Sequence, residues 1–481
     1  MAQLGVIKVY SIFERIGLRG GGKVKAVYHR LNALAEVADF DPILLNLDHS
    51  PRQKLNFAEL QDKGTIAPRV RFLTVPEACQ EAALRAGGKP FEDYPAYDQV
   101  EVKGQKTEYF HQGVSVMVDR TKPTLIGDVT KRKVPDPQGE RLFTLINGDL
   151  HEQIQRKADG VVETTDYVQS LPVRWVKSKD RNFVIGRNLV TDTICRMERV
   201  YHQNVYDQIS WGQAVVFFDG VTSAYLSQVT RGERVLFLHA DHRAPSGEIV
   251  PRSQYLIENF KGEAIVTSTQ VHKEQIAEDV VAAAPVHVVP HFCELPDPAK
   301  AARRHLVTVS RLELVGKPIH ECIEAFCQIK DDFPDVDYLI YGVGAGQADL
   351  EALIDRLACA DRVKLEGYTT DAIGVFQGAL ASVYPTMTEG FGLSILEALS
   401  CNCPVISYDV NYGPREMIKD GVNGALVQPH DIPAIASAMH DVLSRSEHYR
   451  HGIREGLKQY SREAYLENYS ELVRGLVKTA G

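Results

Sequence analysis

Two glutamates, Glu389 and Glu397, stand eight residues apart in the stretch TEGFGLSILEALSC, which covers residues 388–401. Eight helical positions would leave their side chains about 80° out of line, so one helix face cannot hold both. The glycines between them let backbone N–H groups approach a ligand, and a helix N-terminus behind such a loop attracts phosphate. The spacing therefore predicts Glu389 on a loop and Glu397 on a first helical turn, with sugar hydroxyls as ligands. A capping box from Ser394 to Glu397 is the alternative.

A diphosphate also requires cations, and the stretch VTVSRLELVGKP (307–318) supplies two of them. Arg311 can contact phosphate oxygens with two N–H groups, and Lys317 adds a point charge. Both follow the apolar run HLVTVS, which is typical of a buried strand. An Arg and a Lys at the end of a strand usually have solvated side chains and no ligand. Because this pair occurs together with the glutamate loop, it indicates an anion site instead.

Strands and helices that alternate along most of the chain must position these residues. Short apolar runs indicate strands buried on both faces, and helix-compatible stretches separate them. Residues 5–75 follow this pattern, with a helix predicted from Lys23 to Ala35, and the pattern resumes after residue 205. A Pro-containing polar segment at 293–304 precedes a second series. We expect an α/β protein with two doubly wound domains facing a cleft, where ligands bind at the carboxyl ends of the strands.

Between residues 101 and 204 the pattern changes to apolar and polar residues in alternation, which is typical of half-buried strands. The dipeptides Asn147-Gly148 and Asp159-Gly160 lie between candidate strands and are hairpin signals. We therefore expect an antiparallel sheet inserted into the first α/β domain. The predicted domains are 1–100 and 205–297 for the N-terminal domain, 101–204 for the insert, 298–465 for the C-terminal domain and 466–481 for a helix that could cross back to the N-terminal domain.

The composition argues against several classes of protein. The net charge of −9 disfavours general nucleic-acid binding, and no apolar run reaches the roughly 18–20 residues of a membrane span. The eight cysteines form no C-x-x-C pair and follow no secretory signal, so neither a disulfide framework nor a zinc site is indicated. We expect a cytoplasmic protein, and association with the inner face of the cell membrane is left open.

The charge is unevenly distributed. Residues 101–200 carry 17 Lys and Arg against 14 Asp and Glu, a balance of +3, so the rest of the chain carries −12. A solvated sheet face would explain these basic residues, and an anionic partner is the alternative. The residues expected to bind such a partner are Lys131, Arg132, Lys133, Arg174, Lys177 and Lys179.

The order of segments in residues 305–430 resembles the C-terminal half of retaining nucleotide-sugar glycosyltransferases of family four. The segments include SRLELVGK, DYLIYGVGAGQADLEALI, VKLEGYT and YPTMTEGFGLSILEALSC. The resemblance implies the GT-B fold, in which two Rossmann-like domains face a cleft, here with the antiparallel β-sheet insert in the N-terminal domain. It also implies a UDP-sugar-dependent retaining hexosyltransferase that needs no metal and no cofactor.

The resemblance further implies roles for individual residues. Arg311 and Lys317 would bind the donor pyrophosphate, although they stand six residues apart where the family usually has five. Glu397 would bind the ribose, and Glu389 would be a catalytic residue facing the transferred sugar. The other donor-binding residues that it implies are Gly21, Gly22, Tyr368, Gly390, Phe391, Gly392 and Leu393.

A histidine after a strand of the N-terminal domain is also implied near the donor sugar. The stretch RVLFLHADHRAP (234–245) offers His239 and His242 for this catalytic role, and His239 is favoured slightly. Metal binding by this pair is conceivable, but no third ligand stands at a recognisable spacing. Asp335 and Asp337 precede a strand rather than follow one, so no metal site is predicted there either.

A β-rich insert followed by FLHADH resembles two subgroups of the family. One glycosylates wall teichoic acid, and the other adds N-acetylglucosamine to serine-rich adhesins. We predict transfer of glucose or N-acetylglucosamine from a UDP-sugar to a hydroxyl of a cell-surface polymer such as polyol-phosphate wall teichoic acid. The alternatives are Ser/Thr of serine-rich adhesins, a capsule or lipopolysaccharide acceptor and, in another class, a non-catalytic transferase-like partner subunit. The exposed edges of the inserted sheet favour a homo-oligomer.

Overall fold

The structure is a computed structural model of the 481-residue chain. By its internal contacts the chain divides into two compact units, Met1–Val235 with Leu476–Gly481, and Leu236–Gly475. This division falls after Val235, whereas the sequence placed the domain boundary after residue 297. The structure describes residues 6–13, 16, 22–47, 51–78, 95–136, 139–147, 149–157, 161–168, 171–180, 183–188, 194–195, 211, 213–219, 226–227, 230–244, 246–296 and 303–479.

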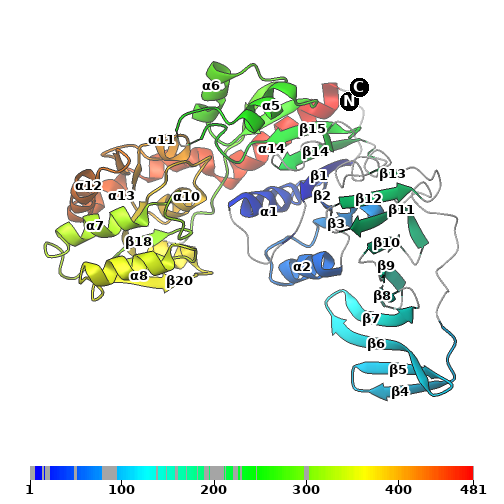
Figure 1. Ribbon diagram of the computed structural model, residues 1–481. Helices are drawn as coiled ribbons and strands as arrows, with labels where there is room; N and C mark the ends of the chain where they lie inside the picture. The colour runs from blue at the N-terminus through cyan, green and yellow to red at the C-terminus, as the bar shows by residue number, and fades with distance from the viewer. Residues whose placement is uncertain are drawn as a thin grey trace. The chain divides into compact units, whose positions relative to one another are not determined.

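The predicted first α/β series forms a seven-stranded sheet with the order β17-β16-β15-β14-β1-β2-β3 (Figure 1). Strand β1 pairs in parallel with β2 and with β14, as expected for apolar runs buried on both faces. The elements of this series are β1 (Ile7–Phe13), α1 (Gly22–Leu34), β2 (Phe40–Asn46), α2 (Pro51–Asp62), β3 (Arg71–Thr74), α3 (Val75–Ala78), β14 (Ala214–Asp219), β15 (Glu233–Phe237), α5 (Pro251–Asn259), β16 (Ala264–Thr267), α6 (Gln270–Asp279) and β17 (Val286–Val288).

A buried ion pair joins distant parts of the first unit. Arg30 on α1 is 1% exposed, and its Nη1 donates to Oδ1 of Asp219 at the end of β14 over 2.9 Å. Nη2 donates to the hydroxyl of Ser11 over 2.9 Å, and the guanidinium lies 4.3 Å from the ring centroid of Phe217. Because each partner would be an uncompensated buried charge without the other, the pair fixes α1 against the sheet.

The predicted insert is a ten-stranded antiparallel sheet whose strands follow chain order from β4 to β13. β8 pairs with β9 and β9 with β10, so both predicted hairpins are present as strand pairs. Asn147 follows β8 with a φ of +52°, whereas Gly148, Asp159 and Gly160 lie outside the described residues. The strands are β4 (Gln99–Lys103), β5 (Lys106–His111), β6 (Val114–Thr124), β7 (Gly127–Asp136), β8 (Gly139–Ile146), β9 (Asp149–Lys157), β10 (Val162–Val168), β11 (Leu171–Asp180), β12 (Phe183–Asn188) and β13 (Ile194–Cys195).

The second α/β series forms a six-stranded parallel sheet with the order β20-β19-β18-β21-β22-β23. Numbered along the chain, this is the 3-2-1-4-5-6 order of doubly wound folds, and the order reverses between β18 and β21. The strands are β18 (His305–Val309), which lies within the predicted run HLVTVS, β19 (Tyr338–Tyr341), β20 (Val363–Gly367), β21 (Ala379–Tyr384), β22 (Val405–Tyr408) and β23 (Gly424–Val427).

Helices cover both faces of this sheet. One face packs with α7 (Ile319–Ile329), α8 (Gln347–Arg356) and α12 (Ile432–Ser444) into a single apolar cluster. The other packs against α9 (Ala372–Gln377), α10 (Leu393–Ser400) and the short helix η3 (Arg454–Tyr460). The remaining helices are α11 (Gly413–Met417), α13 (Ser446–His451) and α14 (Arg462–Thr479). Among the helices that the structure describes, none has the length and the apolar character of a membrane-crossing segment.

Candidate functional site

The two predicted site loops lie at the same edge of the six-stranded sheet. β18 and β21 are neighbouring parallel strands, so the loop with Arg311 and the loop with Glu389 both leave from their carboxyl ends. A third loop, after β19, packs against the first. A Cβ on Gly342 would lie 1.8 Å from the carbonyl oxygen of Ser310, and one on Gly344 would lie 2.4 Å from that of Leu312. The glycine-rich YGVGAG turn therefore serves close packing beside Arg311.

Lys317 and Glu389 form the centre of this site. The Lys317 Nζ donates to Glu389 Oε2 over 2.8 Å, to the Thr386 hydroxyl over 2.8 Å and to the Tyr384 hydroxyl over 2.9 Å. The Tyr384 hydroxyl itself donates to Glu389 Oε2 over 2.8 Å. An ammonium has three N–H groups, so these bonds use all of its donors. The prediction that Lys317 contacts a pyrophosphate stays a prediction. It requires the ammonium to give up one of these three bonds for a bond to a phosphate oxygen.

Burial sets the electrostatics of this cluster. Desolvation lowers the pKa of Lys317, while the neighbouring carboxylate of Glu389 opposes this shift. Burial raises the pKa of Tyr384, and the negative charge of Glu389 raises it further. Tyr384 is therefore a neutral hydrogen-bond donor at physiological pH. The Glu389 carboxylate, whose side chain is 22% exposed, is held by two donors on one oxygen.

The loop after Glu389 leads directly into α10. Gly392 is the N-cap residue with a φ of +87°, in the left-handed region that glycine adopts without strain. No side chain caps this helix, and Ser394 is its second residue, so the capping-box alternative for Glu397 is wrong. A capping box would require Ser394 to be the N-cap residue, just before the helix. Here Gly392 is the N-cap residue, so the helix already begins at Leu393. Glu397 is the fifth residue of α10, just beyond the first turn on which the spacing predicts it.

The other predicted donor residues differ in their exposure. Arg311 has a 69% exposed side chain, and its Nη1 donates to Glu313 over 2.7 Å. Tyr368 follows β20 and is 52% exposed. Phe391 is buried, with its ring edge-on to that of His291 at 4.9 Å. Leu393 is half-buried at the start of α10. Gly22 is the first residue of α1, whereas Gly21 lies outside the described residues.

The two candidate histidines have different surroundings. A Cβ on Gly390 would lie 2.2 Å from the carbonyl oxygen of His239, so the glycine lets the His239 backbone approach the glutamate loop. His239 is partly exposed. His242 is 1% exposed, and its Nε2 lies 2.7 Å from Oδ2 of Asp279. This geometry favours His239 for a role beside a donor sugar and leaves His242 to an internal cluster.

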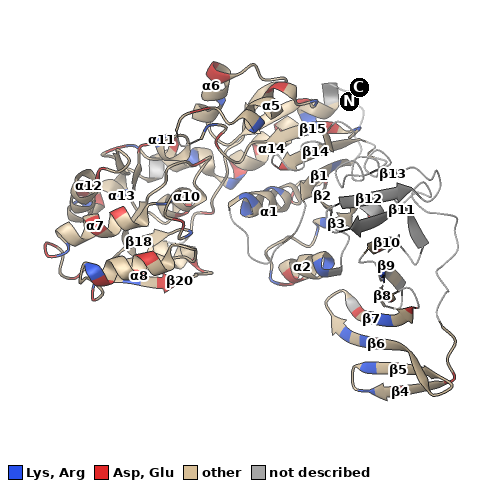
Figure 2. Cartoon of the chain, in the orientation of Figure 1, with Lys and Arg blue, Asp and Glu red and all other residues tan. Residues whose placement is uncertain are grey.

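The basic residues of the insert do not form one patch. Arg132 donates through Nε and Nη2 to the two carboxylate oxygens of Asp119, both over 2.8 Å, and is 15% exposed. Lys131 and Lys133 flank it on β7 and are exposed, because successive strand residues point to opposite faces. Lys133 pairs with Glu140. Figure 2 shows basic residues along β4 to β7. The side chains of Arg174, Lys177 and Lys179 on β11 lie outside the description.

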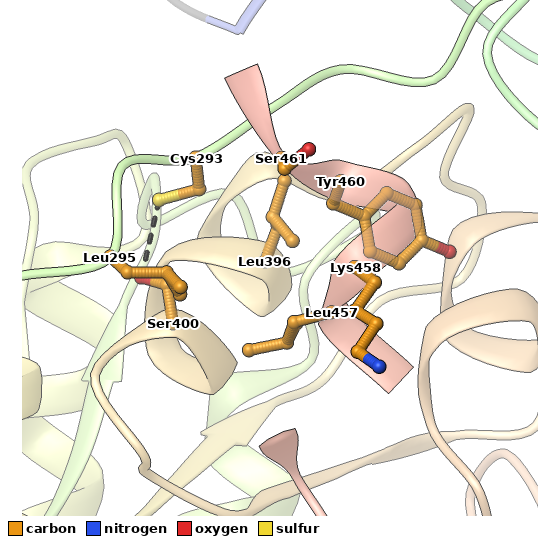
Figure 3. Close-up of a pocket in the computed structure, with 8 residues that line it drawn as sticks. All are labelled: Cys293, Leu295, Leu396, Ser400, Leu457, Lys458, Tyr460 and Ser461. Carbon is orange, nitrogen blue, oxygen red and sulfur yellow. Dashed lines mark hydrogen bonds between the residues drawn. The ribbon is translucent and has the colours of Figure 1, made fainter. Parts of the chain in front are cut away.

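A small pocket lies beside α10 (Figure 3). The Cys293 thiol at its wall donates to the Ser400 hydroxyl over 3.2 Å, and burial raises the pKa of this thiol to about 12. It therefore stays protonated and unreactive at physiological pH. The lining residues are Cys293, Leu295, Leu396, Ser400, Leu457, Lys458, Tyr460 and Ser461, and none of the predicted donor residues is among them.

Comparison with known proteins shows similarity between the second half of the chain and glycosyl transferases. Residues 297–459 match the family model described as Glycosyl transferases group 1. The poly(glycerol-phosphate) alpha-glucosyltransferase of Bacillus subtilis (strain 168) is 29% identical over 197 residues, which are 39% of this chain. These residues span 29% of the length of that relative.

Two of the solved structures that resemble this chain match it along almost its whole length. A variant of S. aureus TarM in complex with fondaparinux, alpha-GlcNAc-glycerol and UDP gives a TM-score of 0.72 at 18% identity, with 97% of this chain and 99% of the other covered. The pneumococcal O-GlcNAc transferase GtfA in complex with UDP and GlcNAc gives 0.72 at 17% identity, with 98% and 99% covered. These likenesses confirm the predicted GT-B fold with an inserted sheet.

Proposed function

We propose that the protein is a retaining glycosyltransferase that moves glucose or N-acetylglucosamine from a UDP-sugar to a hydroxyl of a polyol-phosphate polymer such as wall teichoic acid. The observation that carries the donor half is the cluster of Arg311, Lys317 and Glu389 at the carboxyl ends of β18 and β21, where the strand order reverses. Doubly wound sheets bind their ligands at this position. The N-terminus of α10 opens toward the same edge, since Gly392 directly follows the loop of Glu389.

The residues of this cluster supply positive and negative groups for different parts of a donor. The backbone N–H groups at the start of α10 and the guanidinium of Arg311 would stabilise the diphosphate as its charge develops. Glu389, oriented by Lys317, would accept hydrogen bonds from the transferred sugar. Glu397 would bind the ribose hydroxyls, and Tyr368 would lie by the base. We propose that this arrangement serves the diphosphate without a divalent cation.

A retaining course is part of this proposal, as the resemblance to retaining glycosyltransferases implies. We propose that the acceptor hydroxyl attacks the anomeric carbon from the face that the diphosphate leaves. The bond from this carbon to the diphosphate oxygen breaks, the bond to the acceptor oxygen forms, and the acceptor proton passes to the departing diphosphate. Glu389 then orients the sugar and forms no glycosyl-enzyme.

The polyol-phosphate acceptor is supported by charge and by similarity. Lys131 and Lys133 are exposed on one face of β7, in the part of the chain with a positive balance. Lysines of this kind bind polyanions in a salt-dependent manner. The Bacillus subtilis relative is named for poly(glycerol-phosphate), and the TarM complex contains alpha-GlcNAc-glycerol. Serine-rich protein is the second candidate acceptor, because the O-GlcNAc transferase GtfA matches the chain with the same TM-score as the TarM variant.

The test uses the full chain with UDP-glucose, UDP-N-acetylglucosamine and UDP-galactose in a thermal-shift panel, followed by incubation with polyribitol phosphate, polyglycerol phosphate or a serine-rich peptide. We expect one UDP-sugar to raise the melting temperature, to be hydrolysed slowly alone and to be consumed rapidly with a polyol phosphate. Rapid transfer to the peptide alone would overturn the acceptor assignment. A chain that neither binds nor hydrolyses any UDP-sugar would be a non-catalytic partner.

Two sets of variants separate the donor half from the acceptor half. Glu397→Ala is expected to abolish the UDP-sugar shift, while Glu313→Ala, on the exposed partner of Arg311, serves as the matched control and keeps the shift. Changing both Lys131 and Lys133 to Ser is expected to raise the KM for the polyol phosphate and to leave the UDP-sugar shift unchanged. Equal loss of donor and acceptor binding in the lysine variant would contradict this division of roles.

A further inference from the structure

Four polar side chains converge in the interior of the second unit, apart from the Lys317 and Glu389 cluster. They are Asp241 and His242 after β15, His272 in the first turn of α6, and Tyr412 before α11. His242 and His272 are 1% and 0% exposed, Tyr412 is 0% exposed, and the Asp241 side chain is 11% exposed. The sequence offered no third ligand for the two histidines of the HADH segment. The fold brings His242 alone of these two against His272, a residue 30 positions further along the chain, and leaves His239 outside the cluster.

The distances between the potential ligand atoms suit a tetrahedral ion. His242 Nδ1 lies 3.2 Å from His272 Nε2, 3.2 Å from the Tyr412 hydroxyl and 3.7 Å from Asp241 Oδ1. The Tyr412 hydroxyl lies 2.7 Å from Asp241 Oδ1. Four ligands at about 2.0–2.1 Å from Zn²⁺ stand roughly 3.3 Å apart at tetrahedral angles. Three of the four measured separations are within a few tenths of an ångström of this value, and only the Tyr412 to Asp241 pair must open.

The surrounding groups fix the histidine in the form that binds metal. His242 Nε2 lies 2.7 Å from Asp279 Oδ2, so it carries the proton and donates to this carboxylate. The lone pair of Nδ1 is then directed at the other three side chains. Asp279 is itself held by the guanidinium of Arg243, whose Nε donates over 2.6 Å. A carboxylate behind a ligating imidazole is the arrangement that orients histidines in metal sites.

The charges of the cluster also balance around a divalent cation. Ligands bind in their deprotonated forms, so Asp241 and Tyr412 would each bring one negative charge and the two imidazoles none. Zn²⁺ would neutralise the pair. Asp279 and Arg243 already neutralise each other. A closed set of four protein ligands, without a position for water, is typical of a structural site rather than a catalytic one.

We propose that Asp241, His242, His272 and Tyr412 bind one Zn²⁺ as a structural ion. The site would join three segments that are distant in the sequence. Tyr412 forms a parallel bridge with Glu389, in which its N–H donates to the Glu389 carbonyl over 2.7 Å. A zinc ion on Tyr412 therefore also restrains the backbone of the glutamate loop. The proposal stands on its own geometry and does not depend on the proposed transferase function.

The test titrates Co²⁺ and then Zn²⁺ into the chelator-stripped full chain. We expect one equivalent of Co²⁺ to give the intense visible bands of a four-coordinate site and one equivalent of Zn²⁺ to remove them. His272→Gln and Asp241→Asn are each expected to weaken cobalt binding at least 100-fold. Asp279→Asn, which changes the group behind His242 and also breaks the ion pair with Arg243, is expected to weaken cobalt binding about 10- to 100-fold. His440→Gln, at a half-exposed histidine outside the cluster, is the control and keeps full binding.

The result that would overturn the proposal is a stripped and folded chain that gives no cobalt bands, which would leave the cluster as a hydrogen-bond network only. Unchanged binding in both His272→Gln and Asp241→Asn would overturn it equally. Far-UV circular dichroism shows whether each variant is folded, and the partly exposed Asp241 provides the milder change if His272→Gln fails to fold. Because cobalt absorption needs no substrate, this outcome is separate from that of the UDP-sugar panel.

Discussion

Replacing Tyr384 with Phe tests whether the buried hydrogen bonds around Glu389 position it for catalysis. The change removes one oxygen and keeps the ring beneath Lys317, whose Nζ lies 4.3 Å from the ring centroid. The lost hydroxyl donates to Glu389 over 2.8 Å and accepts from Lys317 over 2.9 Å. Hydrogen bonds to charged groups contribute about 1.5–3 kcal/mol each, but Lys317 and Glu389 keep their direct contact, so we expect a total loss of about 2–3 kcal/mol in the free energy of unfolding.

The same variant is expected to lower kcat/KM for transfer. About 1.4 kcal/mol corresponds to a tenfold change in rate, so partial loss of the orientation of Glu389 should lower kcat/KM between about tenfold and about 100-fold. Urea unfolding measures the first effect, and radiolabelled UDP-sugar transfer measures the second. Tyr338→Phe is the matched control. Tyr338 is also buried in the same sheet, but its hydroxyl meets the neutral hydroxyl of Thr308 at 2.7 Å.

For Tyr338→Phe we expect a loss of about 1 kcal/mol in stability and no loss of kcat/KM, because a neutral hydrogen bond away from the site is removed. Unchanged kcat/KM in Tyr384→Phe would refute the positioning role of its hydroxyl. An equal fall in kcat/KM in both variants would show that the effect comes from weakened folding rather than from the orientation of Glu389.

Three further predictions concern stability. Asp219→Asn, which removes the buried carboxylate that accepts from Arg30, is expected to lower the free energy of unfolding by about 3–5 kcal/mol in urea, whereas replacing both residues by apolar ones should cost much less. Gly413→Ala should lower the melting temperature and transfer activity together, because its Cβ would lie 1.5 Å from the carbonyl oxygen of Phe391; normal values for both would contradict this packing. Burial raises the pKa of Glu416, so between pH 4.5 and this raised pKa the folded chain binds more protons than the unfolded chain, and stability should fall as the pH rises. Glu416→Gln should remove this slope in urea titrations at several pH values, and an unchanged slope would assign it to another group.

The elements of the fold could be predicted from the sequence because their signals are local. Five strands of the six-stranded sheet are largely apolar runs of four to six residues, as burial on both faces requires, whereas the edge strand β20 alternates buried Val363 with exposed Lys364 and Glu366. The hairpin at Asn147 followed from a dipeptide that adopts positive φ readily. The same local pattern placed Arg311 and Glu389 at strand ends, and neighbouring parallel strands then bring such ends together.

The partners of the site residues could not be predicted, since they depend on distances that no local pattern contains. Thr386 and Tyr384 resemble ordinary strand-end residues in the sequence, yet both bind the ammonium of Lys317. The sequence allowed two N-cap residues for α10, Gly392 and Ser394. Only the backbone conformation, with a positive φ at Gly392, identifies the glycine as the cap.

The sequence by itself therefore determined the order of strands and helices, the two kinds of sheet and the loops that carry Arg311 and Glu389. Tertiary structure decided which side chains meet. It placed His272 against His242 and Arg30 against Asp219, 189 residues apart. The physical reason is that hydrophobic periodicity acts within one element, whereas a buried hydrogen bond or ion pair needs two elements packed within about 3 Å.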